Sequence, residues 1–203
     1  MNTFTTLTDS HAETVVQRSR FIAFVYHIES ESEAAEILAS LRKKYYDSTH
    51  VCYAYVADVD GNVTKSSDDG EPSGTAGSPI LSVISGGEYR QTLIAVVRYF
   101  GGTKLGVGGL VKAYTDSANA AVRASEKRLN VLSRIYSATV DYNLFRKISG
   151  AVTRAGGKIT DTVYGEKVDF SFALPSTVDI VALTDLTGGK TEFFNRGYRY
   201  EIY

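Results

Sequence analysis

Hydrophobic and polar positions follow two different rhythms along the N-terminal half of the chain. Residues 15–28 are rich in apolar and β-branched side chains, which predicts a long strand or one arm of a hairpin. Residues 50–57 alternate as a strand does, and the near-continuous apolar run at residues 92–100 predicts a strand covered on both faces. After Ser30, and again after Gly109, apolar side chains recur every three or four residues. Two helices are therefore predicted there.

Cap and turn residues place the ends of several elements. Ser30 followed by Glu33 has the spacing of a capping box, in which each side chain accepts a hydrogen bond from the other residue's backbone. Asp60-Gly61 is a hairpin turn signal, because glycine adopts positive φ without steric penalty. Residues 63–66 are therefore predicted to return as a strand.

The C-terminal part of the sequence has its own order of elements. No period holds over residues 129–134, and a linker is predicted there. The rest alternates as strand, helix, strand, strand, helix and strand, with Gly156-Gly157 and Gly188-Gly189 ending the helices. This is the β-α-β-β-α-β arrangement of ferredoxin-like domains. We therefore predict an α+β protein of two domains, residues 1–132 and 136–203.

Composition narrows the class of protein. The 203 residues are 43% hydrophobic and 22% charged, which is ordinary for a soluble globular protein. No apolar run approaches the roughly 18 residues of a membrane helix, and residues 1–14 show no signal-peptide pattern. Cys52 is the only cysteine, so no intrachain disulfide can form and a reducing, cytoplasmic location is expected.

Charge is uneven along the chain although the net charge is only −1. Residues 58–71 hold five acids against one lysine, whereas residues 98–134 hold seven bases against two acids. The near-zero net charge argues against a protein that binds nucleic acid over its whole surface. The local excess of bases is explained by a solvated helix face or by an anion-binding patch.

Residues 68–114 carry the strongest functional signal. They hold 10 of the 18 glycines and two of the three prolines, in two loops that flank the apolar run. The second loop, Gly101 to Gly109, lies between a buried strand and a helix, so its free N–H groups can point at an anion. Close packing of the strand against the helix explains the same glycines. The spacing matches neither the dinucleotide-binding nor the P-loop pattern.

Cations and flat rings accompany this glycine-rich loop. Tyr99 and Phe100 beside basic residues suit stacking on RNA bases, although half-buried sheet packing explains the same rings. The candidate phosphate- or nucleic-acid-binding residues are Arg98, Tyr99, Gly101, Gly102, Lys104, Gly106, Gly108, Gly109 and Lys112.

The acidic turn before it allows two interpretations. Its carboxylates can hold Mg²⁺ with substrate phosphates completing the coordination, or they can cap and orient the loop. Hydroxyl groups here are candidate nucleophiles only if a base lies near, and the chain has just three histidines. The candidate loop-orienting or metal-binding residues are Asp68, Asp69, Glu71, Ser73 and Thr75. No catalytic residue and no firm cofactor is assigned, and one cysteine makes zinc a poor fit.

Three segments resemble the YigZ/Impact family. Ser67–Gly77 and Val97–Tyr114 look like its signature, and His50–Tyr55 resembles its strand motif, with Val51 where asparagine is more usual. The resemblance covers about residues 18–125. The remainder resembles the smaller C-terminal domain of bacterial members, a ferredoxin-like domain likened to those of elongation factor G.

The resemblance implies a fold and a field of function. The N-terminal domain should be ribosomal S5 domain 2-like, a sheet with helices on one side, a superfamily that also contains small-molecule kinases. Eukaryotic Impact proteins act in translational control through an extra N-terminal domain that is not part of these 203 residues. For the bacterial type, binding to nucleic acid or the ribosome is inferred from the fold.

Three functions therefore stay open. RNA or ribosome binding predicts an open, positive surface. An enzyme acting on a phosphorylated small molecule predicts a closed cleft that contains Asp68, Ser73 and Lys104. A protein–protein adaptor predicts an exposed apolar patch on one sheet. No membrane partner is expected, and the sequence does not set the oligomeric state.

Overall fold

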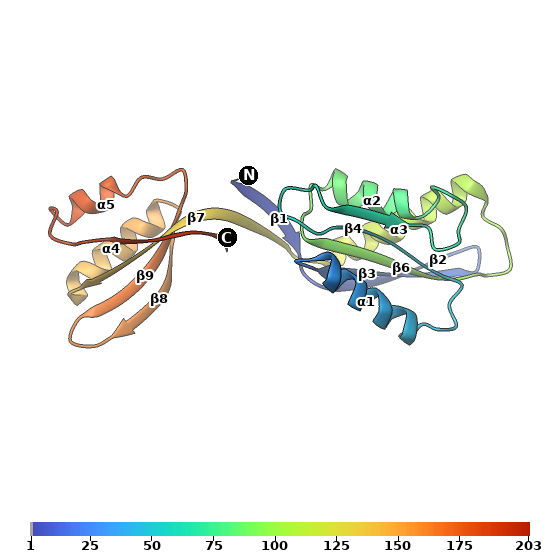
Figure 1. Cartoon of the computed structure of the whole chain (residues 1–203), viewed down its shortest axis with the longest axis horizontal. Helices are drawn as coiled ribbons and strands as arrows, with labels where there is room; N and C mark the ends of the chain where they lie inside the picture. Colours follow the sequence, from blue (N-terminus) through green and yellow to red (C-terminus); the bar gives the residue numbers. More distant parts are fainter. Residues whose placement is uncertain (1) are drawn as a thin grey trace. The chain divides into compact units, whose positions relative to one another are not determined.

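The structure is a computed structural model that describes residues 2–203, and it divides into two compact units. The N-terminal unit comprises residues 3–129, and the C-terminal unit comprises residues 130–203 together with Asn2. Each unit has its own hydrophobic core. The predicted α+β fold with two domains is confirmed, and Figure 1 shows the elements of each unit.

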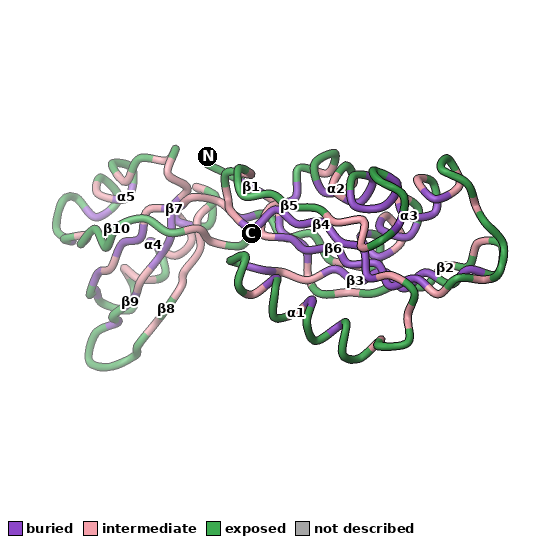
Figure 2. Tube along the Cα trace, turned by 45° about the vertical axis from the view of Figure 1, so that its right-hand side comes forward, coloured by how far each residue is buried: buried purple, intermediate pink, exposed green. Residues whose placement is uncertain are grey.

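A five-stranded antiparallel sheet forms the centre of the N-terminal unit. Its strand order is β2-β3-β6-β4-β5. The strands are β2 (Ser10–Val16), β3 (Ser19–His27), β4 (His50–Val56), β5 (Thr64–Ser67) and β6 (Thr92–Tyr99). The strand predicted at residues 92–100 is thus the central one, and Figure 2 shows β3, β4 and β6 largely buried.

Helices cover both faces of this sheet. Helices α2 (Gly77–Gly86) and α3 (Gly106–Ala124) lie on one face, and α1 (Glu31–Lys44) lies on the other (Figure 1). Successive side chains of β4 point to opposite faces of the sheet, and both faces need covering. Cys52 packs toward α2 and α3, whereas Val51 packs toward α1. The expectation of helices on one side only was therefore wrong, since both faces of the central strands are apolar.

Helix α1 begins as the sequence predicted. Ser30 is its N-cap, and the Ser30 hydroxyl accepts a hydrogen bond from the Glu33 N–H at 3.2 Å. The Glu33 carboxylate reaches back to the N–H of Glu29 rather than to that of Ser30. By contrast, α2 had no predicted counterpart, and α3 starts four residues earlier than its apolar period suggested.

The C-terminal unit has the ferredoxin-like order of elements. They are β7 (Lys127–Val140), α4 (Tyr142–Arg154), β8 (Lys158–Tyr164), β9 (Val168–Pro175), α5 (Val181–Leu186) and β10 (Phe194–Ile202). In its sheet, β9 pairs with β7 and β8, and β10 also pairs with β7, whereas β1 (Thr3–Leu7) belongs to the N-terminal unit. Phe170, Phe172 and Leu174 of β9 pack against Ile148 and Val152 of α4.

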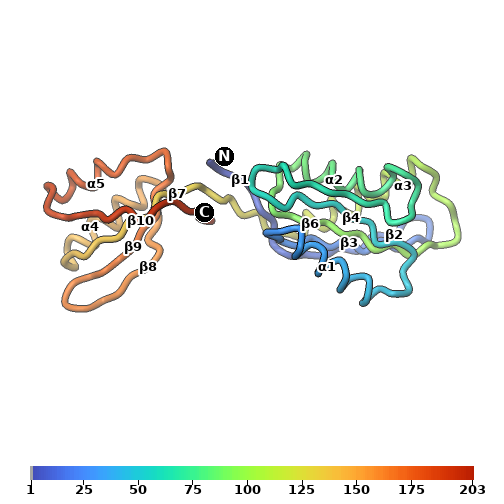
Figure 3. The backbone as a smooth tube through the Cα atoms, viewed as in Figure 1, coloured from blue at the N-terminus to red at the C-terminus, as the bar shows by residue number. Residues whose placement is uncertain are grey.

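One local prediction in this part of the chain was wrong. Residues 129–134 are not a linker but lie inside β7, where Asn130–Arg134 pairs with Tyr198–Ile202 of β10 (Figure 3). Buried polar residues, Asn130 and Ser133, hide the strand period there. Helix α5 is only six residues long and buries Leu183.

Candidate functional site

A pocket of about 340 Å³ lies beside the start of α3 in the N-terminal unit. It brings together the acidic turn that follows β5 and the glycine-rich loop that follows β6. Its walls are largely apolar, with two cations and one carboxylate among them. The residues that line it are Glu71, Pro72, Arg98, Phe100, Lys104, Leu105, Gly106, Val107 and Leu110.

Glycines shape the loop in two ways. A Cβ on Gly101 would lie 2.1 Å from the carbonyl carbon of Arg18, so this glycine is needed for close packing of the loop on β3. Its N–H donates to the Ser19 hydroxyl at 3.1 Å and is not available to a ligand. Gly102 and Gly106 have positive φ values of +82° and +72°, which favour glycine, and open space surrounds both.

The N-terminus of α3 is open to solvent. Leu105 is its N-cap and makes no side-chain capping hydrogen bond, and Gly106, Val107 and Gly108 are all exposed. The first backbone N–H groups of a helix have no partner within the helix, and they carry the positive end of its dipole. Lys104, next to them, is exposed and forms no ion pair within residues 2–203.

Arg98 is placed differently from the surface cation that the sequence suggested. It lies in β6, and its side chain is only 5% exposed. Its guanidinium donates to Glu71 at 2.5 Å and to the Ser19 hydroxyl at 3.3 Å. The group also lies over the rings of Phe21 and Phe100, at 5.3 and 5.6 Å from their centroids. Arg98 is therefore part of the pocket wall and not of an open surface.

Glu71 is the centre of a buried polar network. Besides Arg98, it accepts a hydrogen bond from the Tyr114 hydroxyl at 2.7 Å, and the Cys52 thiol lies 3.3 Å from that hydroxyl. Burial raises the pKa of the Cys52 thiol to about 12 and raises the pKa of Tyr114 above its ordinary value. Both groups therefore stay protonated at neutral pH, and the network joins β4, β6 and α3 behind the pocket.

Asp68 organises the acidic turn. Its carboxylate accepts hydrogen bonds from the N–H groups of Gly74, Ala76 and Gly77 at 2.8–2.9 Å. Burial alone would raise its pKa, but these three amides outweigh burial and hold the pKa of Asp68 below its ordinary value. The carboxylate thereby caps the start of α2.

The other acidic residues of the turn are also engaged. Asp69 accepts hydrogen bonds from the Arg42 side chain at 3.1 Å and from the Val51 N–H at 2.7 Å. Within residues 2–203 there is no group of three or more His, Cys, Asp or Glu side chains that could hold a metal ion. The interpretation of this turn as a magnesium site thus gains no support from the arrangement of its carboxylates.

The remaining candidate residues lie outside the pocket. Ser73 is exposed, and the hydroxyl of the buried Thr75 donates to the carbonyl oxygen of Pro72 at 2.6 Å. Lys112 forms an ion pair with Asp116 at 2.7 Å, and the Tyr99 hydroxyl donates to Asp47 at 2.8 Å. Of the residues that the enzyme hypothesis placed in one cleft, only Lys104 lines the pocket, and Asp68 and Ser73 do not.

Sequence reasoning missed several residues that build the site. Ser19 receives hydrogen bonds from both Arg98 and Gly101, and Val107 and Leu105 form apolar walls. Tyr114 carried a usable signal, because it is the one large polar side chain within the small-residue stripe of α3. For Ser19 the sequence offers no signal, since its partners lie about 80 residues away.

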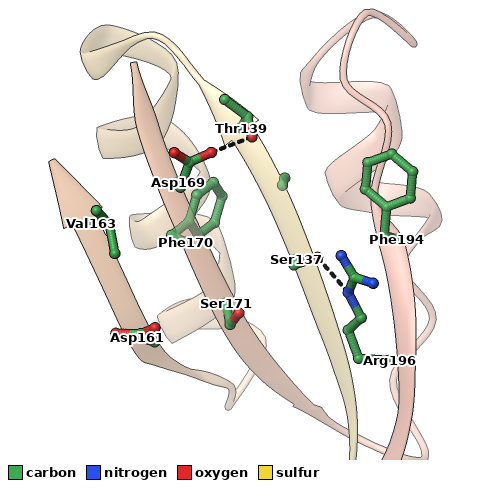
Figure 4. Close-up of a pocket in the computed structure, with 10 residues that line it drawn as sticks. Ser137, Thr139, Asp161, Val163, Asp169, Phe170, Ser171, Phe194 and Arg196 are labelled. Carbon is green, nitrogen blue, oxygen red and sulfur yellow. Dashed lines mark hydrogen bonds between the residues drawn. The ribbon is translucent and has the colours of Figure 1, made fainter. Parts of the chain in front are cut away.

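The open face of the C-terminal sheet carries polar and charged side chains together with two exposed apolar ones, Val163 and Phe194. Figure 4 shows Asp161, Asp169 and Arg196 on this face, with α4 and α5 behind the sheet. Asp169 accepts a hydrogen bond from Thr139, and Arg196 donates to the Ser137 hydroxyl at 2.8 Å. The face therefore combines both signs of charge with two exposed apolar side chains and is not a basic surface.

No helix within residues 2–203 is long and apolar enough to cross a membrane.

Comparisons with known proteins agree with the architecture. The Impact N-terminal domain family matches residues 17–122, and the domain of unknown function DUF1949 matches residues 139–190. IMPACT family member YvyE of Bacillus subtilis is 34% identical over 93% of this chain and 88% of its own length. IMPACT family member YigZ of Escherichia coli is 35% identical over 79% of this chain and 80% of its own.

A solved structure shares the fold of the whole chain. A crystal structure of a hypothetical protein, 31% identical, matches 96% of this chain and 97% of its own with a TM-score of 0.63. The matched domains, the identity to curated relatives and this shared fold all lead to one conclusion. The chain belongs to the IMPACT family.

Proposed function

We propose that this protein binds RNA or a ribosomal surface in the cytoplasm and thereby takes part in translation regulation. The observation that carries the proposal is the exposed, uncapped start of α3 beside an unpaired lysine, Lys104. Helix N-termini bind phosphate groups through backbone N–H groups and the helix dipole, and a neighbouring lysine adds a full charge. Membership of a family whose eukaryotic members act in translational control supports the same field of function.

The three cations of the candidate set have unequal roles in this proposal. Lys104 is the surface cation that meets a phosphate. Arg98 is held by Glu71 and acts only inside the pocket, while Lys112 is already neutralised by Asp116. The polar, mixed-charge face of the C-terminal sheet contributes little to phosphate contact.

A filter-binding titration with structured RNA at several salt concentrations tests the proposal. Log affinity should fall linearly with log salt concentration, because phosphate contacts release counterions. Lys104→Ala should weaken binding and reduce the salt slope by about 1. Arg123→Ala is the matched control, because Arg123 is exposed in the last turn of the same helix, far from the pocket. It should change neither quantity appreciably.

Two results would contradict the proposal. Affinity that does not depend on salt would mean that phosphate contacts contribute nothing. Equal losses for Lys104→Ala and Arg123→Ala would mean that α3 offers only a diffuse positive field and no site at its N-terminus.

An enzyme acting on a phosphorylated small molecule is the second candidate. The observation that favours it is the pocket itself, which lies between the acidic turn and the glycine-rich loop as that hypothesis requires. Glu71 is the single carboxylate among the lining residues, and it is paired with Arg98. The structure therefore supports a binding protein better than an enzyme. If the protein released inorganic phosphate from nucleoside monophosphates, and Glu71→Gln abolished that release, the enzyme would become the preferred candidate.

A further inference from the structure

We propose that the open face of the C-terminal sheet is an interface at which two copies of this chain pack face to face. Helices α4 and α5 pack on the opposite face of that sheet (Figure 4). The exposed large or charged side chains of the open face form what we call the open-face patch: Asp161, Val163, Asp169, Phe194 and Arg196. This inference goes beyond the proposed function, because it concerns a different surface in the other unit.

Strand pairing sets part of the patch in a row that crosses the whole sheet. Asp161 of β8 is the partner of Ser171, and Ser171 is the partner of Ser137. Ser137 is in turn the partner of Phe194 in β10. Arg196 turns back to this row, because its Nε donates to the Ser137 hydroxyl at 2.8 Å. A carboxylate and a guanidinium therefore lie at opposite margins of the sheet, with small side chains between them (Figure 4).

The charges of the patch are not matched within the chain. Asp161, Asp169 and Arg196 form no ion pair within residues 2–203. The same sheet pairs charges elsewhere, since Lys158 lies 2.7 Å from the Glu201 carboxylate. Opposite charges that are both exposed and too far apart to meet in one copy can meet across an interface between two copies.

A two-fold axis parallel to the strands brings the two margins together. Sheets that pack face to face lie about 10 Å apart and keep their strands within about 30° of each other. Because the strand order is β8-β9-β7-β10, a half turn about this axis places β8 of one copy over β10 of the other. Asp161 of each copy then meets Arg196 of the other copy. The contact forms twice, as in any interface with two-fold symmetry.

The exposed apolar side chains fit the same packing. Val163 lies on β8 and Phe194 on β10, so the half turn also brings these two together from different copies. Both are exposed in the single chain, and covering them removes apolar surface from water. The middle of the face carries the small side chains Ser137, Thr139 and Ser171, which let the two sheets approach closely.

A second copy fits this patch better than nucleic acid or a basic peptide does. Two carboxylates and one guanidinium make the patch net negative, which repels a phosphate backbone. A basic peptide would match Asp161 but would face Arg196 with a like charge, whereas a second copy matches both. The patch is smaller than a standard interface of about 20–30 residues a side, so the dimer is weak and depends on concentration.

Sedimentation equilibrium of the full chain over a wide range of protein concentration tests the inference. The wild type should dimerise reversibly. Asp161→Lys and Arg196→Glu should each raise the dimer dissociation constant at least about tenfold, because each replaces two attractions across the axis by two repulsions. Lys147→Glu is the matched control, since it reverses an exposed charge on α4, behind the sheet, and should leave the constant unchanged.

An equimolar mixture of the two single variants is the decisive sample. Asp161→Lys alone and Arg196→Glu alone each place like charges opposite each other. In a mixed dimer, both contacts join opposite charges again. The mixture should therefore dimerise about as tightly as the wild type, although neither variant does so alone. Recovery on mixing also excludes a folding defect as the cause of the single losses.

Asp169 gives an expectation of the opposite sign. It lies on β9 beside the axis, so the half turn places it over Thr139 on β7 of the other copy and not over a cation. The same turn brings the two Asp169 carboxylates toward each other, and like charges oppose association. Asp169→Asn should therefore tighten the dimer severalfold. A dimer that is not tightened would overturn the placement of the axis between β9 and β7.

Three further results would overturn the inference. A wild type that stays monomeric at every concentration would exclude a second copy, and a loss of RNA affinity in Arg196→Glu would then assign the patch to RNA. A dimer that tolerates both single variants would have its interface elsewhere. Variants that stay monomeric when mixed would show that these charges do not pair across a two-fold axis. RNA binding through Lys104 would stand or fall separately in each case.

Discussion

At the scale of single residues, the site depends on one buried ion pair. Arg98 and Glu71 are each at most 5% exposed in their side chains, and their contact of 2.5 Å joins β6 to the acidic turn. Burying two charges is costly, so such a pair adds little net stability by itself. Removing one partner, however, leaves an uncompensated charge. The pair therefore fixes the shape of the pocket more than it stabilises the fold.

Glu71→Ala should for this reason destabilise the protein strongly, by about 3–5 kcal/mol. The double variant Glu71→Leu with Arg98→Met should recover much of that loss, because it removes both charges and keeps apolar volume. Urea unfolding followed by circular dichroism measures both. A single variant that costs less than about 1 kcal/mol would mean that solvent reaches Arg98 readily.

Asp68 should make stability depend on pH in one direction. Its pKa is lowered in the folded protein from 3.8, because three backbone amides outweigh the opposing effect of burial. A lowered pKa contributes stability above the unfolded value, and this contribution is lost as pH falls through the lower folded value. The free-energy difference between the wild type and Asp68→Asn should thus be largest near pH 7 and shrink below about pH 4. Urea midpoints at both pH values measure it, and a constant difference would contradict this role.

At the scale of elements, glycines in one loop should respond oppositely to the same substitution. Gly101→Ala should destabilise the protein by about 1–3 kcal/mol, because its Cβ would clash with the backbone of Arg18. Gly108→Ala should stabilise by up to about 1 kcal/mol, since the position is helical and nothing lies within 4 Å. Thermal unfolding of the two variants checks the signs. Equal effects would mean that the loop tolerates Cβ atoms generally.

Elements were predictable from the sequence where their burial follows a local period. The apolar run of β6 and the stripe of α3 from Leu110 to Val122 are examples. Helix α2 was not predictable in this way, because it is short and its N-terminal amides are capped by Asp68 from nine residues away. The pocket shows the same limit. Its two loops were visible in the sequence, but the pairing of Arg98 with Glu71 spans 27 residues.

At the scale of the whole molecule, β7 determines where the chain can be cut into fragments that fold independently. It runs from Lys127 to Val140, and its part from Asn130 onward belongs to the C-terminal unit. β10 pairs with residues 130–137 of β7, and β9 pairs with residues 133–140. A boundary inside residues 129–134 therefore cuts a strand that holds two neighbours.

The fragment 130–203 should consequently fold cooperatively, whereas 136–203 should not, or should unfold at a clearly lower urea concentration. The shorter fragment removes the partners of five β10 residues, Tyr198–Ile202, and exposes a row of unpaired backbone groups. Fragment 130–197 deletes the same pairing from the side of β10 and leaves residues 133–135 paired with β9. Circular dichroism should therefore show that its sheet is weakened, and that the sheet of 136–203 is weakened at least as much. Equal urea midpoints for 130–203 and 136–203 would mean that the pairing of β10 with Asn130–Arg134 contributes nothing to the C-terminal unit.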